Sequence, residues 1–288
     1  MQISAALVKE LREKTGAGIL DAKKALEAND GDMEKAMEFL RQKGIASADK
    51  KMGRIAAEGI VASKINDDKA VLIEVNCETD FVAKNADFKE FVNNLADCLT
   101  KSDIDNVEDF INSACPCDQS KKVEDVIKEK IATIGEKITL RRFVRYTGNV
   151  ATYVHNNKIG VLVKTDKKDD ALAKDICLHI ASNAPEFISR EDIPQEVIDE
   201  ETRIEMGKED LAKKPENIRA KIVEGRVNKL MAQKCLLEQP FVKNPDQTIQ
   251  QLIEGKLNIL GFTRYELGEG LEKKECNFAQ EVMDQMNK

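Results

Sequence analysis

The residues that could take part in chemistry gather in one short stretch, residues 76–84, which read NCETDFVAK. The stretch holds two carboxylates and a thiol, and it places the large apolar side chain of Phe81 directly after Asp80. The six residues before it, AVLIEV at 70–75, form an apolar run that predicts a buried strand. A periodic helix pattern opens at Ala86. The stretch therefore connects a strand to a helix, and such connections carry functional residues disproportionately often.

Two roles for Phe81 remain open from the residues alone. In the first, the ring folds back onto the core and Asp80 caps a helical turn. In the second, the connection presents the ring as a wedge that enters a pocket on a partner. An exposed aromatic ring at such a place requires an explanation, because exposed apolar surface often marks an interaction site.

Residues for conventional catalysis are scarce in the rest of the chain. The chain has only two histidines. We expect His155 at an exposed turn and His179 in a structural role on a helix, since neither sits in a nucleophile motif. Gly16 and Gly18 lack the third glycine and the preceding strand of a phosphate-binding loop. These observations predict a protein that is not an enzyme and that has no cofactor.

Three arginines occur in the alternating strand pattern at 138–146, namely Arg141, Arg142 and Arg145. They could form a phosphate-binding patch. The alternative, which we favour, is that they cover the solvated face of an antiparallel strand.

The seven cysteines are scattered, and the N-terminus does not resemble a secretion signal. We therefore expect reduced thiols in a cytoplasmic protein. Cys115 and Cys117 are separated by one residue, and no second pair completes a zinc site, so no metal is expected. A redox enzyme that uses Cys115 or Cys117 is a rival hypothesis.

Composition excludes two further classes of protein. Of the 288 residues, 34% are charged and 5% are aromatic, and the net charge is −7. A negative chain is poorly suited to direct nucleic-acid binding, which requires a surplus of Lys and Arg. No run of about 18 apolar residues is present, so no membrane span is expected.

The elements that position the stretch follow from hydrophobic periodicity. Residues 3–43 predict three short amphipathic helices, the third ending before Gly44, with a linker at 46–54. A strand–turn–strand pattern at 58–75 recurs at 149–165 with an offset of 90 residues. Each copy leads into a helix, and this repetition indicates two related α+β halves. The second copy has KKDD at 167–170 in place of the aromatic stretch, so the fold does not require Phe81.

The remaining elements are helices around 104–112 and 120–133, the second ending at Ile134-Gly135. Residues 186–233 carry two apolar stripes and a KKP turn, which predict an antiparallel helical hairpin. These apolar stripes would be exposed to solvent unless the hairpin packs against the rest of the protein or a partner covers them. The C-terminal part predicts a helix at 247–257, a strand at 257–267 and a short helix at 278–286.

Several motifs, taken in order, resemble those of the elongation factor Ts family. They are LVKELREKTGAG at 7–18, DAKKAL at 21–26, EVNCETDFVA at 74–83, IGE at 134–136 with Arg141-Arg142, IGVLV at 159–163, PEFI at 185–188, EGR at 224–226 and QPFV at 239–242. The resemblance covers nearly the whole chain. Only the segment at 100–122, which includes Cys115 and Cys117, follows no recognised pattern.

The resemblance implies an α+β fold with five parts. They are a ubiquitin-associated-like three-helix domain with its linker at 1–54, a core N subdomain at 55–147, a core C subdomain at 148–185 and 234–270, a dimerisation hairpin at 186–233, and a C-terminal module at 271–288.

The resemblance also implies a guanine nucleotide exchange factor in the cytoplasm. Its partner would be the translational GTPase elongation factor Tu, bound first with GDP and then nucleotide-free. Members of the family release GDP by intruding beside the Mg²⁺ site of the GTPase, and Thr79, Asp80, Phe81 and Val82 match the intruding residues. Ile134, Gly135 and His155 match further contacts. The alternative is a chaperone-like interaction protein that binds through the hairpin.

Overall fold

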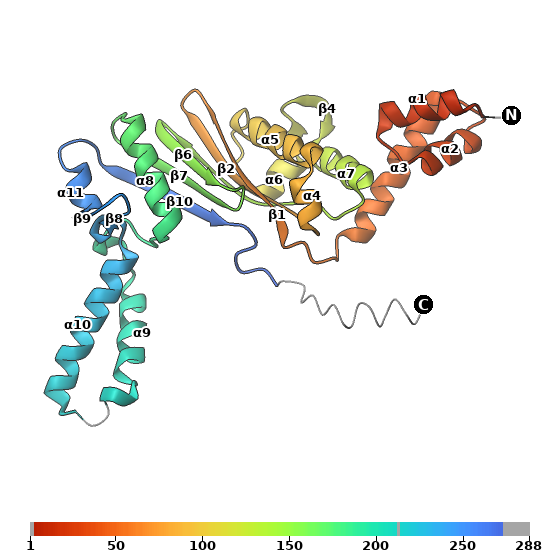
Figure 1. Ribbon diagram of the computed structural model, residues 1–288. Helices are drawn as coiled ribbons and strands as arrows, with labels where there is room; N and C mark the ends of the chain where they lie inside the picture. The colour runs from red at the N-terminus through yellow and green to blue at the C-terminus, as the bar shows by residue number, and fades with distance from the viewer. Residues whose placement is uncertain (1–2, 212–213, 273–288) are drawn as a thin grey trace. The chain divides into compact units, whose positions relative to one another are not determined.

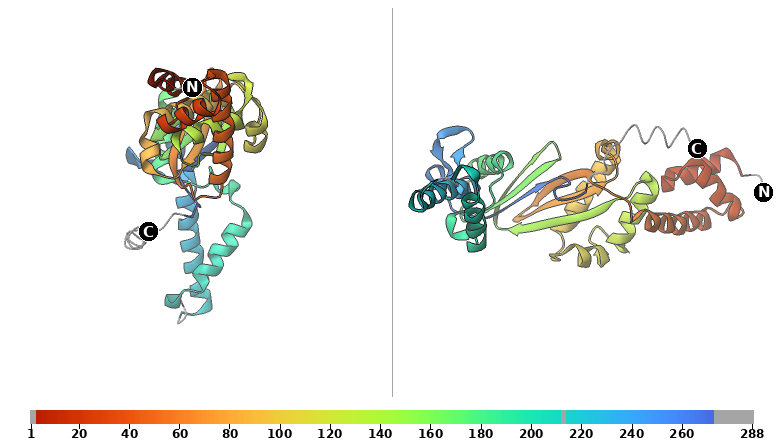
Figure 2. Two further views of the ribbon diagram at one scale, coloured as in Figure 1. Left: turned by 90° about the vertical axis from the view of Figure 1, so that its right-hand side faces the viewer. Right: turned by 90° about the horizontal axis from the view of Figure 1, so that it is seen from below.

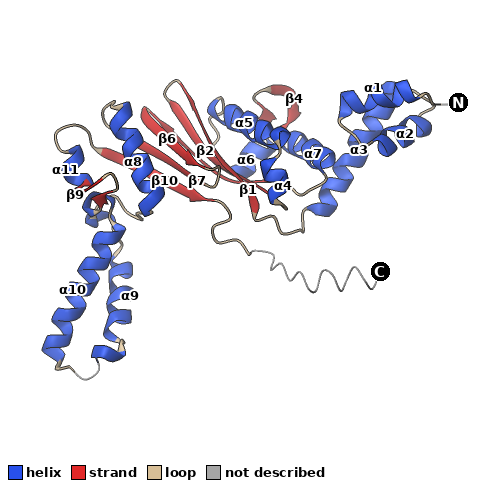
Figure 3. Cartoon of the chain, viewed as in Figure 1, coloured by secondary structure: helices blue, strands red, loops and turns tan. Residues whose placement is uncertain are grey.

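The computed structural model describes residues 3–211 and 214–272. Helices and antiparallel sheets both occur, which confirms the α+β prediction (Figure 3). The described residues divide into two compact units, one formed by residues 3–64, 73–144 and 265–272 and the other by residues 65–72, 145–211 and 214–264. Within the described ranges, no helix is both long and apolar enough to cross a membrane. The helix predicted at 278–286 lies outside the described residues.

Three helices form the N-terminal module, as predicted: α1 (Ala5–Thr15), α2 (Ile19–Ala28) and α3 (Met33–Lys51) (Figure 2). Their small shared core consists of Val8, Leu11, Ala22, Ala25, Leu26 and Ala36. The predicted end before Gly44 and the linker at 46–54 are wrong, because α3 continues to Lys51. Gly44 is needed for packing: a Cβ there would lie 2.8 Å from the Cβ of Ala132. A glycine in mid-helix thus allows close helix contact.

A three-stranded sheet with the order β1-β2-β5 carries the predicted functional stretch. Its strands are β1 (Glu58–Asn66), β2 (Lys69–Cys77) and β5 (Thr139–Thr147). After β2 come α4 (Asp80–Lys84) and α5 (Ala86–Thr100), whose buried face includes Phe88, Val92 and Leu95. The stretch after the strand is thus itself a short helix.

The segment at 100–122, which the sequence left open, has ordered secondary structure. It contains α6 (Val107–Asn112) and a small two-stranded sheet of β3 (Ala114–Cys115) and β4 (Asp118–Lys122). The chain continues into α7 (Val123–Ile134), which packs against α3. The expectation that all cysteines are reduced is wrong for two of them, because Cys98 of α5 and Cys117 form a disulfide.

Glu74 of β2 is fully buried and explains two of the three arginines. Arg141 Nη1 lies 2.9 Å and Arg142 Nε 2.6 Å from its carboxylate oxygens, and the Gly268 amide donates to it at 2.9 Å. Burial alone would raise the pKa of Glu74, but these hydrogen bonds outweigh burial and hold the pKa below its usual value. Arg141 and Arg142 therefore form neither a phosphate patch nor a merely solvated face; they neutralise a buried carboxylate.

The second unit repeats the hairpin-then-helix arrangement. β6 (Asn149–His155) pairs in antiparallel fashion with β7 (Ile159–Thr165), and β10 (Ile259–Glu266) completes the sheet in the order β10-β7-β6. The helix α8 (Asp170–Asn183) packs on β6 and β7 (Figure 1). Three residues, Asn156, Asn157 and Lys158, join the two strands, and the positive φ of both asparagines suits this tight turn.

The helix predicted at 247–257 is shorter than expected. β8 (Pro240–Phe241) pairs with β9 (Asn244–Thr248), so Gln247 and Thr248 are extended. The Thr248 side chain then caps α11 (Ile249–Ile253) in a capping box with Gln251. Strand pairing therefore overrides helix propensity at the start of this segment.

The predicted hairpin is formed by α9 (Gln195–Met206) and α10 (Glu216–Lys234), with short 3-10 turns at η1 (Arg190–Asp192), η2 (Glu209–Leu211) and η3 (Leu236–Glu238). The two apolar stripes mostly bury each other, around Ile193, Leu211, Val223, Val227, Met231 and Cys235. Ile204, Met206 and Ile218 stay 41–49% exposed.

His179 has the structural role that the sequence predicts. Its side chain is fully buried, with Nε2 2.8 Å from Gln239 Oε1, and its Nδ1 accepts a hydrogen bond from the Val242 amide at 3.2 Å. Because Nδ1 is an acceptor, a proton there would break this bond. Burial lowers the pKa of His179 below its ordinary value of 6.5.

The stability of the chain should therefore fall in mild acid. The unfolded chain takes up a proton near pH 6.5, whereas folded His179 does so only at lower pH, so the free energy of unfolding decreases as the pH drops below about 6.5. Urea denaturation between about pH 7.5 and 5.5 measures this slope. His179→Gln should flatten the slope. A slope as steep in this variant as in the wild type would contradict this role.

Candidate functional site

The short helix α4 presents the predicted functional residues. Thr79 is its N-cap: it has extended backbone geometry, and its Oγ1 accepts a hydrogen bond from the Val82 amide at 3.4 Å. Asp80 lies in the first turn, not at the cap as one interpretation expected. A helix of only five residues is too short to be stable by itself in water. Its position must therefore depend on contacts with the rest of the unit.

Glu136 supplies the main contact. Its carboxylate accepts three hydrogen bonds from the residues that lead into α4: from the Glu78 amide at 3.1 Å, the Thr79 amide at 3.0 Å and the Thr79 hydroxyl at 2.6 Å. Hydrogen bonds to an ionised acceptor are about twice as strong as those between neutral groups. Glu136 therefore fixes the direction in which α4 leaves the sheet.

Glu78 binds the segment that contains Glu136. Its carboxylate accepts hydrogen bonds from the Lys137 amide at 2.6 Å and from Arg54 Nη1 at 3.2 Å. The Lys137 ammonium in turn donates to the Arg54 carbonyl at 2.9 Å. The Glu136 carboxylate thus binds the segment at 78–79, and the Glu78 carboxylate binds the segment at 136–137.

Phe81 lies on the outer side of this helix. Its side chain is 81% exposed, the highest value among the large apolar residues of the described chain, while the neighbouring Ala83 is buried and Val82 is half-buried. The interpretation in which the ring folds back onto the core is therefore wrong. Leaving a Phe in water instead of burying it forgoes about 1.5–3 kcal/mol of favourable transfer free energy.

Asp80 is ionised and paired beside this ring. Its carboxylate lies 2.6 Å from the Lys84 ammonium, one turn further along α4. That hydrogen bond lowers the pKa of Asp80 and raises the pKa of Lys84. Both groups are solvent-exposed, so the pair orients the turn more than it stabilises the fold.

Ile134 and Gly135 lie next to the same network, because Glu136 follows them directly in the chain. Gly135 ends α7 with a φ of 87°, and its amide donates to the Ile131 carbonyl at 2.8 Å. A Cβ at Gly135 would meet nothing within 4 Å, so the left-handed backbone, not space, is the reason for glycine. The structure therefore brings Thr79, Asp80, Phe81, Val82, Ile134 and Gly135 together.

His155 belongs to the other compact unit. It ends β6 at the exposed turn where the sequence predicts it. Its Nδ1 lies 3.1 Å from the Tyr153 hydroxyl and its Nε2 lies 3.1 Å from the Asn156 side-chain amide. The ring is therefore held in place at the surface.

The site offers little to covalent chemistry. Its only thiol, Cys77, is buried and contacts the Thr79 carbonyl, and burial together with the charge of Glu136 raises its pKa to about 12. A thiol with such a pKa is not a nucleophile at neutral pH. What the arrangement provides is an exposed ring on a fixed support.

Sequence reasoning did not identify the supporting residues as part of the site. In the sequence, Glu136 was noted only as part of the IGE motif and Glu78 only as a neighbour of Phe81. Arg54 was assigned to a linker. No periodicity marks residues that act through backbone hydrogen bonds across 57 or 58 positions. The αL glycine before Glu136 was the one signal that could have indicated a fixed turn there.

Comparison with known proteins decides the family. A family model described as elongation factor TS matches residues 78–269, which include both parts of the site in the first unit as well as His155. The chain is 49% identical to an elongation factor Ts of Halothermothrix orenii, with both chains covered completely. It is 47% identical to that of Alkalilimnicola ehrlichii and 46% identical to that of Clostridium novyi, each with 99% of both chains covered.

The chain belongs to the elongation factor Ts family. Membership identifies it as a translation elongation factor that acts in protein biosynthesis. The predicted family resemblance is thereby confirmed. The family model spans residues 78–269, so it includes Glu78 and Glu136 but not Arg54. The roles of the individual site residues stay predictions.

We expect Glu136→Ala to loosen α4 while the fold is kept. Three donors lose a charged acceptor, and water compensates partly at this half-buried position, so the free energy of unfolding should fall by about 1–2 kcal/mol. Urea denaturation measures this loss. Hydrogen exchange of the amides at 78–84 should accelerate selectively.

The matched control is Glu10→Ala, which removes only an exposed pair with Lys14. It should change stability by less than about 0.5 kcal/mol. If the two variants were equally stable and residues 78–84 stayed protected in both, Glu136 would not be the support of α4.

Proposed function

We propose that this chain is a guanine nucleotide exchange factor for elongation factor Tu. It binds the GDP form of the GTPase, and α4 enters beside the Mg²⁺ site with Phe81 leading. The intrusion displaces Mg²⁺, GDP leaves the nucleotide-free complex, and GTP then binds. The exposed and supported ring of Phe81 is the single observation that carries this proposal.

The energy for the intrusion comes from transfer of the ring out of water. Full burial of a Phe side chain is worth about 1.5–3 kcal/mol, which offsets part of the displacement of helices in the partner. The GTPase holds GDP through backbone amides, a lysine and the metal, so displacing the metal leaves phosphate charge uncompensated. A rigid support is important here, because ordering a flexible loop on binding would cost entropy and offset part of this free energy.

Asp80 and the residues around α4 have subsidiary roles in this scheme. The ionised carboxylate of Asp80 arrives together with the ring and brings negative charge close to the diphosphate. Thr79 and Val82 shape the helical turn, and Ile134 and Gly135 add contact surface next to it. His155, held by Tyr153 and Asn156, is proposed as a further contact from the second unit.

The proposed exchange requires no covalent intermediate, so we propose a non-enzymatic factor without a cofactor of its own. Coupling between the two ligands is reciprocal: a factor that weakens GDP binding must itself be bound more weakly by the GDP form. The net charge of −7 favours a protein partner over direct contact with nucleic acid. We place this activity in the cytoplasm, where translation occurs.

The combined substitution Asp80→Ala and Phe81→Ala should leave a folded protein that barely accelerates GDP release. Phe81→Ala alone should reduce the second-order rate by about ten- to hundredfold, since about 1.5–3 kcal/mol of burial is lost from the exchange transition state. Stopped-flow release of a fluorescent GDP from elongation factor Tu measures this rate.

Ile65→Ala is the matched control, because Ile65 is also an exposed apolar residue, with 44% of its surface accessible, but lies outside α4. It should exchange at the wild-type rate. Wild-type exchange by the double variant would remove α4 from the mechanism and favour a chaperone-like protein that binds through the hairpin.

A second function, self-association through residues 186–233, is favoured by one observation. The hairpin buries most of its apolar stripes internally, yet Ile204, Met206 and Ile218 stay 41–49% exposed near the turn that joins α9 to α10. We propose that a second copy of the chain covers these side chains.

Sedimentation equilibrium tests this association. The combined substitution Ile204→Glu and Ile218→Glu should shift the wild-type dimer to a monomer, because a charge in an apolar interface must be desolvated without a partner. Nucleotide exchange should persist in the monomer. A wild-type chain that stays monomeric at high concentration would refute this second function.

A further inference from the structure

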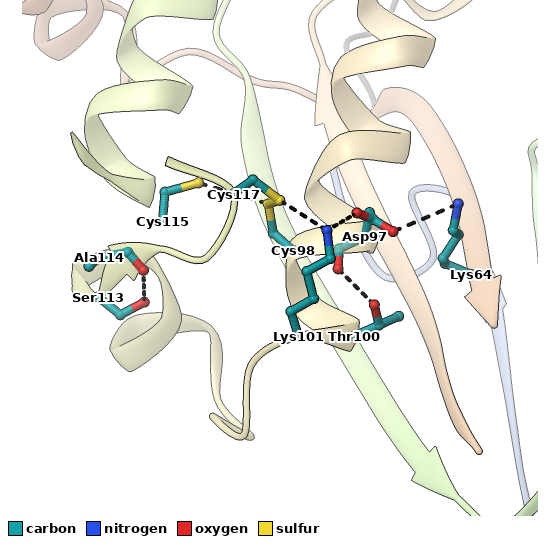
Figure 4. Close-up of a disulfide and its surroundings, with 9 residues drawn as sticks. All are labelled: Lys64, Asp97, Cys98, Thr100, Lys101, Ser113, Ala114, Cys115 and Cys117. Carbon is teal, nitrogen blue, oxygen red and sulfur yellow. Dashed lines mark hydrogen bonds and ion pairs between the residues drawn. A yellow bond between two sulfur atoms is a disulfide. The ribbon is translucent and has the colours of Figure 1, made fainter. Parts of the chain in front are cut away.

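Three of the seven cysteines meet in the first unit, between α5 and the β3–β4 hairpin (Figure 4). Cys98 and Cys117 form a disulfide whose Cα atoms are 5.8 Å apart. The Sγ of Cys115 lies 3.8 Å from that of Cys98, as the dashed line in Figure 4 marks. The disulfide is therefore in direct contact with a free thiol.

The three sulfurs differ in their access to solvent. Cys98 and Cys115 are 2% and 4% exposed, whereas Cys117 is exposed at the surface. All three line one cavity of about 390 Å³, which also includes Phe91 and Leu95 of α5. The cavity gives a small molecule a path to the disulfide.

Charged groups surround the exposed end of the bond. The Lys101 ammonium lies 4.0 Å from Cys117 Sγ and 2.6 Å from Asp97, which also pairs with Lys64 at 3.8 Å. From the hairpin and α7, Asp118, Lys121 and Glu129 line the cavity as well. A neighbouring ammonium stabilises a thiolate, so Lys101 favours negative charge on Cys117 when the disulfide opens.

We propose that Cys98, Cys115 and Cys117 form a thiol–disulfide exchange site, in which Cys117 is the sulfur that thiol-reactive ligands modify. The site has two oxidised forms of equal redox state. One has the Cys98–Cys117 disulfide and a buried Cys115 thiol. The other has a buried Cys98–Cys115 disulfide and an exposed Cys117 thiolate beside Lys101.

The two disulfide forms interconvert without an external oxidant or reductant. Cys115 loses its proton to solvent and its thiolate attacks Cys98 Sγ; the Cys98–Cys115 bond forms as the Cys98–Cys117 bond breaks. The bonding pair leaves with Cys117 as a thiolate, which takes up a proton from solvent or stays paired with Lys101. Two cysteines remain oxidised throughout, as in any thiol–disulfide exchange.

The ligands of this site are low-molecular-weight disulfides and thiols. The free Cys117 thiolate attacks a disulfide such as oxidised glutathione, which gives a mixed disulfide on Cys117 and releases one thiolate. A dithiol reverses the oxidation: it transfers two electrons to the internal disulfide, leaves two thiols and departs as a disulfide. Cys115 is the positioning and exchanging thiol that makes Cys117 available.

Peptide mapping of the full chain tests this site. The protein is oxidised with dissolved oxygen in the absence of glutathione, so that no mixed disulfide forms on Cys117. It is then treated with N-ethylmaleimide under native conditions, and the disulfide-linked peptides are followed by mass spectrometry. In the wild type, maleimide should accumulate on Cys117 while the Cys98–Cys117 link is replaced by a Cys98–Cys115 link. Cys115→Ala should lose the Cys117 labelling and keep the original link.

Cys117→Ser provides the second variant. It should still oxidise to a Cys98–Cys115 disulfide, because the two sulfurs are already in contact, and its unchanged circular dichroism spectrum would confirm the fold. The proposal is overturned if the wild type never yields a Cys98–Cys115 link. It is equally overturned if Cys117 is labelled as fast in Cys115→Ala as in the wild type, or if Cys117→Ser forms no disulfide.

Discussion

The hydrogen bonds from Glu78 and Thr79 to the Glu136 carboxylate are the interaction on which the functional site depends. A five-residue helix has no stability of its own, and its most prominent side chain is an aromatic ring in water. Without a fixed acceptor, the ring would lower its free energy by folding onto the nearest apolar surface. Glu136 prevents this collapse because it fixes the backbone before the helix begins.

The rest of the first unit keeps this acceptor in place. Glu136 lies between the αL end of α7 and the start of β5, and β5 is tied to β2 through Arg141, Arg142 and buried Glu74. Breaking a buried ion pair by removal of one partner is strongly destabilising, so loss of these contacts would be costly. In the proposed exchange reaction, such a support would reduce the entropy that is lost when the ring is ordered on binding.

The two α+β halves differ in the connection between the strand hairpin and the helix. Both contain a strand hairpin followed by a helix, and both place apolar side chains of the second strand in a core. Only the first half inserts α4 between strand and helix. In the second half Asp169 directly caps α8, and no aromatic ring occurs in the connection. Packing thus explains what the halves share, but it does not explain the exposed ring of Phe81.

The sequence predicted what periodicity and local capping control. The N-terminal helices, both strand hairpins, the helical hairpin and the end of α7 at Gly135 follow from apolar spacing and glycine. The failures have tertiary causes. Helix α3 continues through Gly44 because Ala132 packs there, and β8–β9 pairing delays α11. Three further features join residues that are distant in sequence, so periodicity could not predict them. They are the ion pairs of the arginines with Glu74, the Cys98–Cys117 disulfide and the support of α4 by Glu136.

The central claim is that the exposed ring at position 81 becomes buried in elongation factor Tu. Because the chain contains no tryptophan, Phe81→Trp labelled with 5-fluorotryptophan has a single ¹⁹F resonance at this site. The most direct measurement is the ¹⁹F NMR spectrum of this variant during titration with unlabelled, GDP-bound elongation factor Tu. We predict that the resonance moves as the complex forms and loses its solvent isotope shift. A complex that forms and releases GDP while the resonance keeps its free position and its isotope shift would contradict the account.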